Sequence, residues 1–335
     1  MEIFDNIAIT SRIRLARNVD GLKFYTKLQS DIDAQYITGS VMKTLEEFDV
    51  FNFMSLKNLS LNECNALFEK HLISRELIEN KDISSVAISE DEKIIVMINE
   101  EDHIREQCLE KGFNLYKPYR RISKIDDAIL NSLPIAFDSE LGFITASPSN
   151  LGTGMRASVM CFLPACKLCG KIEDIIQRAK ENELTVRGIY GEGSRALGYF
   201  YQISNQGSLG LSEDEIIDKV SEFIYAICQQ EKENRDYLLE SDYASVRDKT
   251  MRAYGQLLHC YSLEEEEMLE FLSQVKLGQV LGFIEVSSDD KFQKLYYEGM
   301  SANLKEIFEF SDKKKENIIR AEYISSKVRE LTKEV

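Results

Sequence analysis

Residues 93–105 (KIIVMINEEDHIR) constrain the fold most strongly, because an apolar run in them leads directly into three consecutive carboxylates. Residues 94–98 are aliphatic and mostly β-branched, which is typical of a strand buried on both faces. Glu100, Glu101 and Asp102 follow where that strand would end. Adjacent negative charges repel one another, so they need nearby cations or a function that uses the charge. The alternative is a solvated acidic loop.

The composition is that of a globular protein. The 335 residues are 44% hydrophobic and 29% charged, which is enough apolar material for one large domain or two moderate ones. No uninterrupted apolar run has the length of a membrane-spanning helix, and the first residues lack the basic and apolar regions of a signal peptide. The sequence therefore predicts a cytoplasmic protein with no membrane partner.

Cysteine spacing and net charge argue against two further classes of protein. The seven cysteines are scattered, as expected of reduced thiols. Cys161, Cys166 and Cys169 come closest to a zinc pattern but lack a second pair, so we interpret them as buried thiols and expect no metal held by the protein alone. The net charge of −16 argues against nucleic-acid binding, because the phosphate backbone favours a basic surface. An anionic ligand would need a local basic cluster.

Such a cluster begins near the N-terminus, in residues 7–18 (IAITSRIRLARN). On an extended strand, Thr10, Arg12 and Arg14 share one face. Like charges held so close are costly unless an anion lies between them, and the planar guanidinium fork suits phosphate oxygens. The alternative is an exposed basic strand at a sheet edge.

A second anion site is predicted after a strand expected over residues 142–147. Residues 148–154 (PSNLGTG) are rich in turn formers, and residues 155–163 have helical composition, which would place Arg156 in a first helical turn. A helix N-terminus offers free N–H groups and the positive end of the helix dipole. The loop is not a Walker A loop, and the GxGxxG, HRD and DFG signatures of protein kinases are absent from the sequence.

A glutamate flanked by glycines follows a third strand candidate. Residues 184–190 (LTVRGIY) have strand character and carry Arg187, and they lead into Gly191, Glu192 and Gly193. Glycines on both sides favour a mobile loop, and such a loop is suited to closing over a substrate.

The remaining patterns divide the chain into two domains. Residues 19–90 read mainly as helix and loop, with His71 either stacking on a base or finishing a helix, the second being favoured by the residues alone. We expect residues 106–140 to be largely helical, 199–204 to form a strand, and 212–239 to form a helix with a Ser212–Glu215 capping box. Helical patterns then dominate over 242–259, 263–276 with a Ser262–Glu265 capping box, 289–309 and 313–333. The prediction is a first domain over 1–240 and a helical domain over 241–335.

The collected residues suit phosphoryl transfer to a guanidinium. Five arginines, at 12, 14, 105, 156 and 187, would clamp a polyphosphate, and a bridging Mg²⁺ would be held mainly through ATP. A hydroxyl acceptor needs one base, whereas a guanidinium needs two carboxylates to hold its fork in line and to take a proton. Glu101 and Glu192 are the candidates.

These residues carry a resemblance to a known family. Residues 10–14 (TSRIR), 99–105 (NEEDHIR), 147–158 (SPSNLGTGMRAS) and 187–192 (RGIYGE) resemble the successive signatures of the phosphagen kinases, the ATP:guanido phosphotransferases. The order of the motifs also matches. The similarity is closest to the bacterial protein-arginine kinases of the McsB type, through LARN, KHLIS, NEEDHIR, RASVM, RGIYGEGS and QISNQ. It covers roughly residues 7–240 in strong motifs and the helical tail loosely.

The resemblance implies a fold and a set of site residues. The fold would be α+β, an antiparallel sheet flanked by helices and similar to glutamine synthetase, followed by an all-helical domain used for dimerisation. The catalytic carboxylates would be Glu101 and Glu192. The ATP site would be lined by Thr10, Ser11, Arg12, Ile13, Arg14, His71, Arg105, Arg156, Ala157, Ser158, Val159, Met160, Arg187, Gly188, Ile189, Tyr190, Gly191 and Glu192.

Two positions depart from the family pattern. Ser147 stands where the family usually has a cysteine close to the guanidinium, and a serine cannot supply a thiolate. In the tail, residues 316–321 (ENIIRA) are the nearest match to an Arg-Asp-x-x-Arg-Ala motif that reads phosphoarginine. Arg320 remains, but Glu316 replaces the leading arginine and would repel a phosphate. We expect phosphoarginine binding there to be weak or absent.

The leading hypothesis is a cytoplasmic, homodimeric protein-arginine kinase that uses ATP and Mg²⁺ to mark proteins. By resemblance, its partners would be arginine-containing protein substrates, a zinc-binding activator, a Clp-type unfoldase and a stress-gene repressor. Only nine residues precede Thr10, whereas kinases of free guanidino compounds carry a helical domain there, so an open site for a protein-bound arginine is expected. The alternatives are a kinase of free arginine or another guanidino metabolite, and a weakly catalytic adaptor that binds phosphoarginine.

Overall fold

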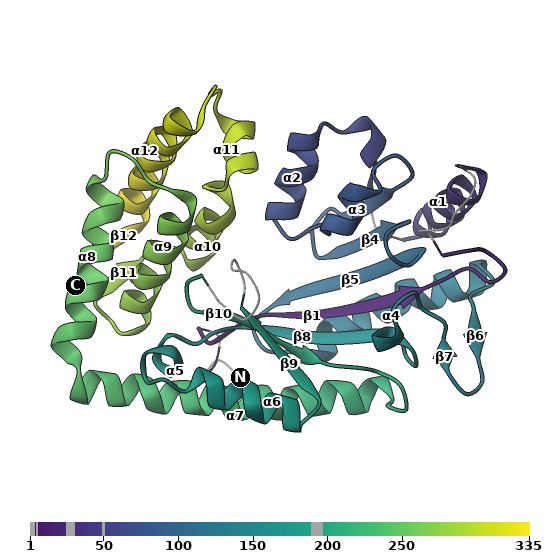
Figure 1. Ribbon diagram of the computed structural model, residues 1–335, viewed down its shortest axis with the longest axis horizontal. Helices are drawn as coiled ribbons and strands as arrows, with labels where there is room; N and C mark the ends of the chain where they lie inside the picture. Colours follow the sequence, from purple (N-terminus) through teal and green to yellow (C-terminus); the bar gives the residue numbers. More distant parts are fainter. Residues whose placement is uncertain (1–3, 5, 25–30, 49–50, 189–196) are drawn as a thin grey trace. The chain divides into compact units, whose positions relative to one another are not determined.

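An eight-stranded sheet is the largest element of the fold (Figure 1). The computed structural model describes residues 4, 6–24, 31–48, 51–188 and 197–335. The strand order is β2-β3-β4-β5-β1-β8-β10-β9, and every pairing from β2 to β8 is antiparallel. The strands are β1 Ala8–Arg17, β2 Phe51–Ser55, β3 Ser85–Ser89, β4 Ile94–Ile98, β5 Ile104–Lys111, β8 Met155–Phe162, β9 Leu184–Gly188 and β10 Phe200–Asn205.

Several predicted strands are confirmed. The apolar run is β4, and all five of its residues are buried, as the absence of alternation indicated. The strand expected over residues 7–18 is β1, at the centre of the sheet between β5 and β8, so the sheet-edge alternative is wrong. Candidates over 184–190 and 199–204 correspond to β9 and β10. The strand expected over 142–147 is reduced to the two-residue β7, Gly142–Phe143, which pairs with β6, Phe137–Asp138.

The predicted helix over residues 155–163 is wrong, because this segment is strand β8. Met155, Ala157 and Val159 are fully buried on one face, while Arg156 and Met160 are half-buried on the other. That two-residue period fits the sheet position between β1 and β10, and pairing on both sides outweighs the helical composition. The proposed anion site at a helix N-terminus therefore does not exist here.

Other regions expected to be helical also contain strands. Strand β5 occupies the start of the region 106–140, and helix α4, Tyr116–Ser132, follows it. Strands β2 and β3 lie within residues 19–90 together with helices α1 Asp31–Leu45, α2 Leu61–Glu69 and α3 Arg75–Glu79. Hydrogen bonding to neighbouring strands distant in the sequence decides these elements.

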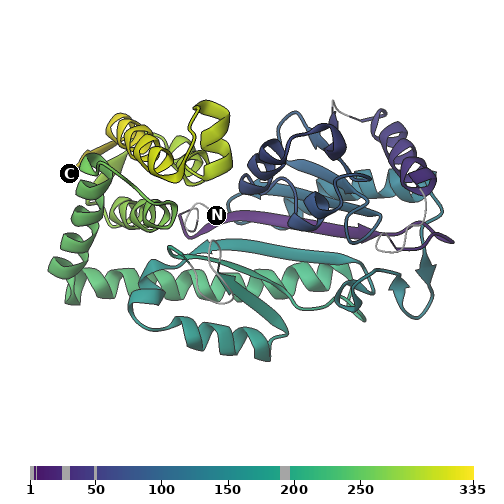
Figure 2. The same ribbon diagram turned by 45° about the horizontal axis from the view of Figure 1, so that its top comes forward.

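The sheet has two different faces (Figure 2). On the first, α2 and α3 pack on the end formed by β3 and β4, through a cluster that includes Leu77, Val86 and Met97. The opposite face is covered at β1 and β5 by α4, whose Ile122, Ile125 and Ile129 are buried. The half-buried residues of β1 and β8 lie on the first face, which is left partly open beyond α2 and α3.

A buried ion pair joins α4 to β1 on the covered face. Arg17 donates from Nε and Nη2 to the two carboxylate oxygens of Asp126, both at 2.8 Å, and its side chain is 1% exposed. Arg17 Nη1 also donates to the carbonyls of Ala16 and Thr153, both at 2.9 Å. The chain passes close by at Gly154, where a Cβ would lie 2.5 Å from Arg17 Nη1. Arg17 therefore fixes the approach to β8 as well as α4.

The chain forms two compact units. The first comprises Met1–Cys161, Gln177–Thr185 and Gln202–Tyr225, and the second comprises Phe162–Ile176, Val186–Tyr201 and Ala226–Val335. The remaining elements are α5 Pro164–Leu168, α6 Ile172–Glu181, α7 Glu213–Ser241, α8 Tyr243–His259, α9 Glu265–Val280, α10 Asp289–Glu298, α11 Ser301–Ile307 and α12 Lys313–Leu331, with a small sheet of β11 Ile284–Val286 and β12 Thr332–Glu334.

The helices expected in the last third of the chain are present with corrected ends. The Ser212–Glu215 capping box is confirmed at the start of α7. Helix α9 instead begins after Glu264, whose N–H donates to Glu267, so the expected Ser262–Glu265 box is wrong. The helix expected over 289–309 is divided into α10 and α11. No helix within the described ranges combines the length and apolar composition that crossing a bilayer requires.

We predict that Asp126→Ala destabilises the protein by about 3–5 kcal/mol, because it leaves the Arg17 guanidinium buried without its carboxylate. The measurement is urea unfolding followed by circular dichroism. Asp127→Ala is the matched control on the same helix, where an exposed carboxylate is removed and a change within about 0.5 kcal/mol is expected. Equal unfolding midpoints for the two variants would show that the Arg17–Asp126 pair does not stabilise the fold.

Candidate active site

Four of the predicted arginines lie on one face of three adjacent strands. Arg14 on β1 is directly opposite Arg156 on β8, and Arg12 is opposite Ser158. On the other side of β1, Arg105 of β5 is opposite Ala16, which shares the face of Arg12 and Arg14. The register thus brings four of the five predicted arginines onto one face, and Arg156 is supplied by a strand and not by a helix start. We call this surface the arginine face.

The arginine face carries more positive charge than its own contacts neutralise. Burial lowers the pKa of Arg12 to about 10, and repulsion from Arg105 and Arg156 adds to this shift. The pKa of Arg14 is lowered by burial and by the same neighbours together with Arg12. Arg14 Nε is buried without a hydrogen-bond partner among the described residues. A bound polyanion would relieve this repulsion and supply the missing acceptors.

The three consecutive carboxylates lie in the turn between β4 and β5, at the end of the arginine face. We call residues 99–103 the acid turn. Asn99 adopts a positive φ of 60°, and its N–H donates to the His103 carbonyl at 2.8 Å. The Glu100 N–H donates to the Asp102 carbonyl at 3.1 Å. These bonds close a tight turn that projects its side chains in different directions.

Two of the three carboxylates are held by structural partners. Glu100 is fully buried and forms an ion pair with Arg105. Burial alone would raise its pKa, but the Arg105 cation and its hydrogen bond hold the pKa of Glu100 below its usual range. Asp102 Oδ1 accepts from Asn18 Nδ2 and from the Ala146 N–H, both at 2.6 Å. Asp102 thus ties the acid turn to β1 and to the segment before Ser147.

Glu101 differs from its two neighbours. Its side chain is half-buried and makes no hydrogen bond or ion pair with any residue that the structure describes. Burial raises the pKa of Glu101, and repulsion from Asp102 and Glu100 adds to the shift. A carboxylate with a raised pKa, beside a cationic surface and without a structural partner, is suited to accept a proton in a reaction.

His103 locks the turn from its other end. Its Nδ1 accepts from the Val19 N–H at 3.0 Å, and Nε2 lies 2.8 Å from the Lys23 carbonyl, to which it donates in the matching tautomer. The His103 N–H donates to Asn18 Oδ1 at 2.9 Å. These contacts make His103 part of the framework and not of the reactive surface.

His71 lies beside Arg12 on the loop between α2 and α3. This loop is attached to the arginine face by Gln107 Nε2, which donates to the His71 carbonyl at 3.4 Å. Burial lowers the pKa of His71 to about 4, and the Arg12 cation contributes to the shift. The imidazole is therefore neutral at pH 7, so it can stack or accept a hydrogen bond without adding positive charge.

The other residues predicted for the ATP site fall into two groups by strand register. Thr10, Ser158 and Met160 share the arginine face, whereas the side chains of Ser11, Ile13, Ala157 and Val159 are buried on the opposite face. Ser11 there donates to the Gly112 carbonyl at 2.8 Å and accepts from the Asn114 N–H at 3.0 Å. The second group supports the strands and does not present side chains to a ligand on the arginine face.

Two further predicted positions are placed only in part. Arg187 is exposed on β9, followed by Gly188 at the strand end. Ile189, Tyr190, Gly191 and Glu192 lie outside the described residues. Ser147 is half-buried next to Ala146, with its hydroxyl 3.0 Å from that of Ser149. The Asp102 bond to the Ala146 N–H brings the Ser147 backbone to the acid turn.

Several residues that position the site were not predicted from the sequence. Asn18 bridges β1 and the acid turn, and Ser204 of β10 accepts from Arg156 Nη2 at 2.9 Å. Gln107 anchors the His71 loop. The alternation of Arg105, Gln107 and Leu109 along one strand could have revealed Gln107, but the roles of Asn18 and Ser204 depend on contacts between distant segments.

Arg320, the remaining arginine of the degenerate tail motif, is completely buried in the second unit. It pairs with Glu316 and donates to the carbonyls of Gly299 at 2.7 Å and Leu263 at 3.1 Å. Burial alone would raise the pKa of Glu316, but hydrogen bonds from Lys313, Ser301 and Arg320 hold it at about 2. Glu316, which replaces the leading arginine of the motif, is therefore already paired with the Arg320 guanidinium.

Comparisons with known proteins assign the family. Residues 34–234 match the model of the ATP:guanido phosphotransferase C-terminal catalytic domain, and residues 243–335 match that of the protein-arginine kinase McsB C-terminal domain. A protein-arginine kinase of Clostridium acetobutylicum is 40% identical over 334 residues, covering 97% of both chains. Another, from Caldanaerobacter subterraneus, is 36% identical and covers 96% of this chain and 97% of its own length.

Solved structures show the same fold. A duplicated taurocyamine kinase from Schistosoma mansoni superposes with a TM-score of 0.63 at 24% identity, over 77% of this chain and 39% of that one. A lombricine kinase gives 0.60 at 25% identity, over 71% and 68%. An antiparallel sheet with flanking helices is thus shared, as predicted. The chain belongs to the ATP:guanido phosphotransferase family, and within that family to the protein-arginine kinases.

Proposed function

We propose that this chain transfers the γ-phosphoryl group of ATP to arginine side chains of proteins. The observation that carries the proposal is the geometry at one end of the arginine face. Glu101 alone among three adjacent carboxylates has no structural partner in the described part of the chain, and it lies at the end of the face that carries the four guanidinium groups, with Arg105 the nearest by register. A cationic surface that ends in an available base suits phosphoryl transfer to a basic nitrogen.

The arginines would bind the triphosphate. Arg12, Arg14 and Arg156 lie side by side on β1 and β8, and Arg105 is oriented by Glu100. Their charges would neutralise the phosphate oxygens and hold the γ-phosphorus in line with the acceptor. Arg187 is proposed to add a fifth contact, and the neutral His71 would lie near the adenine. Mg²⁺, when bound through ATP, would supply further charge neutralisation at the phosphates.

The acceptor step would use Glu101 together with Glu192. The two carboxylates would hold the guanidinium fork, and Glu101 would take a proton from the attacking nitrogen as that nitrogen forms its bond to the γ-phosphorus. The bond between the γ-phosphorus and the bridging oxygen breaks, and ADP leaves. Because a guanidinium stays protonated in water, proton loss has to be concerted with phosphoryl transfer in a desolvated site. The raised pKa of Glu101 favours its acceptance of that proton.

Ser147 would act by orientation. Its hydroxyl can accept or donate a hydrogen bond near the acid turn, but it carries no negative charge at neutral pH. Glu101 and Glu192 would then provide the negative charge that attracts the acceptor guanidinium.

The cellular role is proposed from the family resemblance. A homodimeric cytoplasmic enzyme of this type would mark proteins for a Clp-type unfoldase, respond to a zinc-binding activator and modify a stress-gene repressor. The net charge of −16 would favour basic substrates in a salt-dependent way. Kinases of free guanidino metabolites share the fold, so free arginine is the second candidate acceptor.

We expect the purified chain with Mg-ATP to phosphorylate arginines of an unfolded arginine-rich protein and not free arginine. Phosphate is mapped by mass spectrometry at neutral pH, because the P–N bond is acid-labile. Glu101→Gln should lower kcat by about 100-fold or more through loss of the base. Glu90→Gln, an exposed glutamate elsewhere in the first unit, is the matched control and should leave the rate unchanged. Phosphate only on free arginine would select the metabolite kinase.

The pH profile gives a second test of Glu101. The base works only when ionised, so kcat/KM falls at low pH, and its raised pKa places this acid limb above the pH of an ordinary glutamate. Asp102→Asn removes one repelling charge and should shift the limb to lower pH. Asn can keep both bonds of Asp102, because both use Oδ1. If the acid limb of a folded Asp102→Asn variant lies at the same pH as in wild type, or at a higher pH, Glu101 is not the base.

We predict that a phosphoarginine peptide shows no saturable binding to the C-terminal helices at micromolar concentration. Arg320 is already paired with Glu316, whose pKa near 2 keeps it negative throughout the physiological range. Fluorescence anisotropy of a labelled peptide is the measurement, with the unphosphorylated peptide as control. Tight, phosphate-dependent binding that is lost in Arg320→Ala would contradict the prediction.

A further inference from the structure

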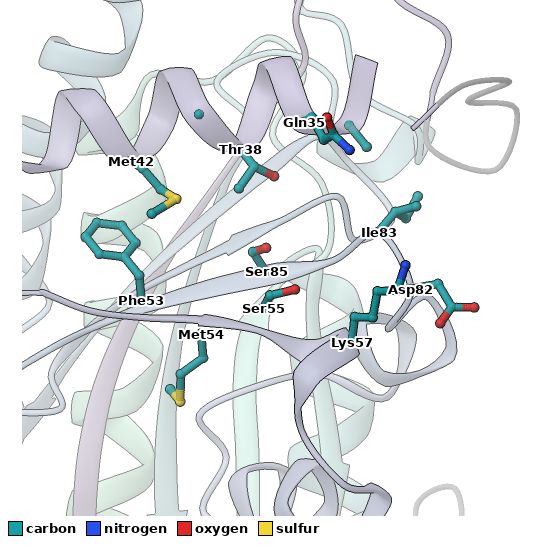
Figure 3. A pocket seen from close by; sticks show the side chains of 12 residues that line it. Gln35, Thr38, Met42, Phe53, Met54, Ser55, Lys57, Asp82, Ile83 and Ser85 are labelled. Atoms are coloured by element: carbon teal, nitrogen blue, oxygen red, sulfur yellow. The ribbon is translucent and has the colours of Figure 1, made fainter. Parts of the chain in front are cut away.

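A cavity of about 420 Å³ lies between helix α1 and strand β2, in the first unit (Figure 3). Phe53, Ser55 and Ser85 contribute to it from the strands, on the face opposite Arg105 by the register of β2, β3, β4 and β5. The cavity is therefore separate from the arginine face. Its volume is in the range of small-molecule sites.

Polar side chains converge on this cavity without partners of their own. Gln35, Ser55, Lys57, Asp82 and Ser85 all line it, and none of these side chains forms a hydrogen bond or ion pair with another described residue. In Figure 3 the two serine side chains lie side by side at the centre, and the lysine and aspartate lie at one end. Gln35, Ser55, Lys57 and Asp82 are exposed, so water satisfies them when the cavity holds no ligand. No ion pair within the protein occupies Lys57 or Asp82 in the described part of the chain, so both charges are available to a ligand.

The opposite part of the cavity is apolar. Met42 of α1 and Phe53 of β2 point toward each other across it (Figure 3). Helix α1 also contributes Gly39 to the cavity lining, where an added Cβ would meet no atom within 4 Å. Glycine destabilises a helix interior relative to alanine, so its place in the cavity wall preserves space at a cost to the helix.

The cavity wall is bonded to the acid turn. Asn99 Nδ2 lies 3.2 Å from the Ala34 carbonyl, 3.3 Å from Thr38 Oγ1 and 3.1 Å from the Ile83 carbonyl. All three of these residues line the cavity. Asn99 begins the acid turn, two residues before Glu101. A ligand that moves α1 or the segment before β3 would therefore shift Asn99 and the adjoining carboxylates.

We propose that this cavity is an effector site for a small zwitterion with an apolar side chain, such as a free hydrophobic amino acid. Lys57 would pair with the carboxylate, Asp82 with the ammonium group, and Met42 and Phe53 would contact the side chain. Occupancy changes the catalytic rate through Asn99. The binding site stands independently of the proposed function, and only the effect on rate rests on it.

Binding is tested by isothermal titration calorimetry of the full chain with L-phenylalanine and L-leucine. N-acetyl-L-phenylalanine lacks the ammonium group and L-phenylalaninamide lacks the carboxylate, so each should bind about three- to five-fold more weakly than phenylalanine, as expected for a partly exposed ion pair. Lys57→Gln should abolish the preference over the amide, and Asp82→Asn the preference over the acetyl derivative. Equal binding of all three compounds, or no binding, overturns the proposal.

Gly39→Leu tests the location. The leucine fills the cavity from α1 and should abolish binding while the helix gains propensity, so the variant stays folded. Gly255→Leu is the matched control, because Gly255 also lies within a helix and an added Cβ there meets nothing within 4 Å. Binding that survives in Gly39→Leu, or is lost equally in both variants, places the ligand elsewhere and overturns the assignment.

The coupling is tested with saturating phenylalanine in the phosphorylation assay. Wild type should change its kcat, and Asn99→Gly should bind the ligand without responding, since glycine keeps the positive φ but removes the amide. Binding with no change of rate in wild type overturns the coupling. If wild type transfers no phosphate to any acceptor, the proposed function fails, and calorimetry still decides whether the effector site exists.

Discussion

Repulsion among guanidinium groups on one sheet face is the constraint on which the site depends. Arg12, Arg14 and Arg156 are held by the register of β1 and β8, so they cannot separate without breaking the sheet. Burial, with repulsion from Arg105 and Arg156, lowers the pKa of Arg12, so the sheet holds these cations in an unfavourable arrangement. A polyphosphate bound to this face would relieve the repulsion, and that relief would add to its binding free energy. In the absence of an anion the repulsion destabilises the fold, so other contacts in the protein must offset it.

The opposite face supplies part of that stability. Arg17, on the same strand as Arg12 and Arg14, is buried on the opposite face, and its Nε and Nη2 donate to the two carboxylate oxygens of Asp126. Next to Arg105, the buried side chain of Glu106 lies against Asp126, and burial, with repulsion from Asp126, raises its pKa well above the usual range. A second carboxylate charge beside Asp126 is costly in this buried position, which favours the protonated form of Glu106. Because successive side chains of β1 and β5 point to opposite faces, Arg12, Arg14 and Arg105 lie on the arginine face, whereas Arg17 and Glu106 lie on the face covered by α4.

The three adjacent carboxylates of the acid turn likewise have different roles. Glu100 orients Arg105, and Asp102 fastens the turn to Asn18 and Ala146, so Glu101 is left available. Asn99 connects this turn to the cavity on the reverse side of the sheet. A single turn thereby links three features: the cationic surface, the segment that carries Ser147, and the proposed effector site.

The amino-acid sequence by itself determined the buried strand β4, the shared face of Arg12 and Arg14, and the family, because periodicity and ordered motifs are local properties of the chain. It did not determine that residues 155–162 form a strand, since Met, Arg and Ala also suit a helix and only pairing with β1 and β10 selects the extended form. Which acidic residue remains available was likewise decided by the tertiary structure. Asn18 and Ala146 reach Asp102 from 84 and 44 residues away, and contacts over such separations leave no pattern in the local sequence.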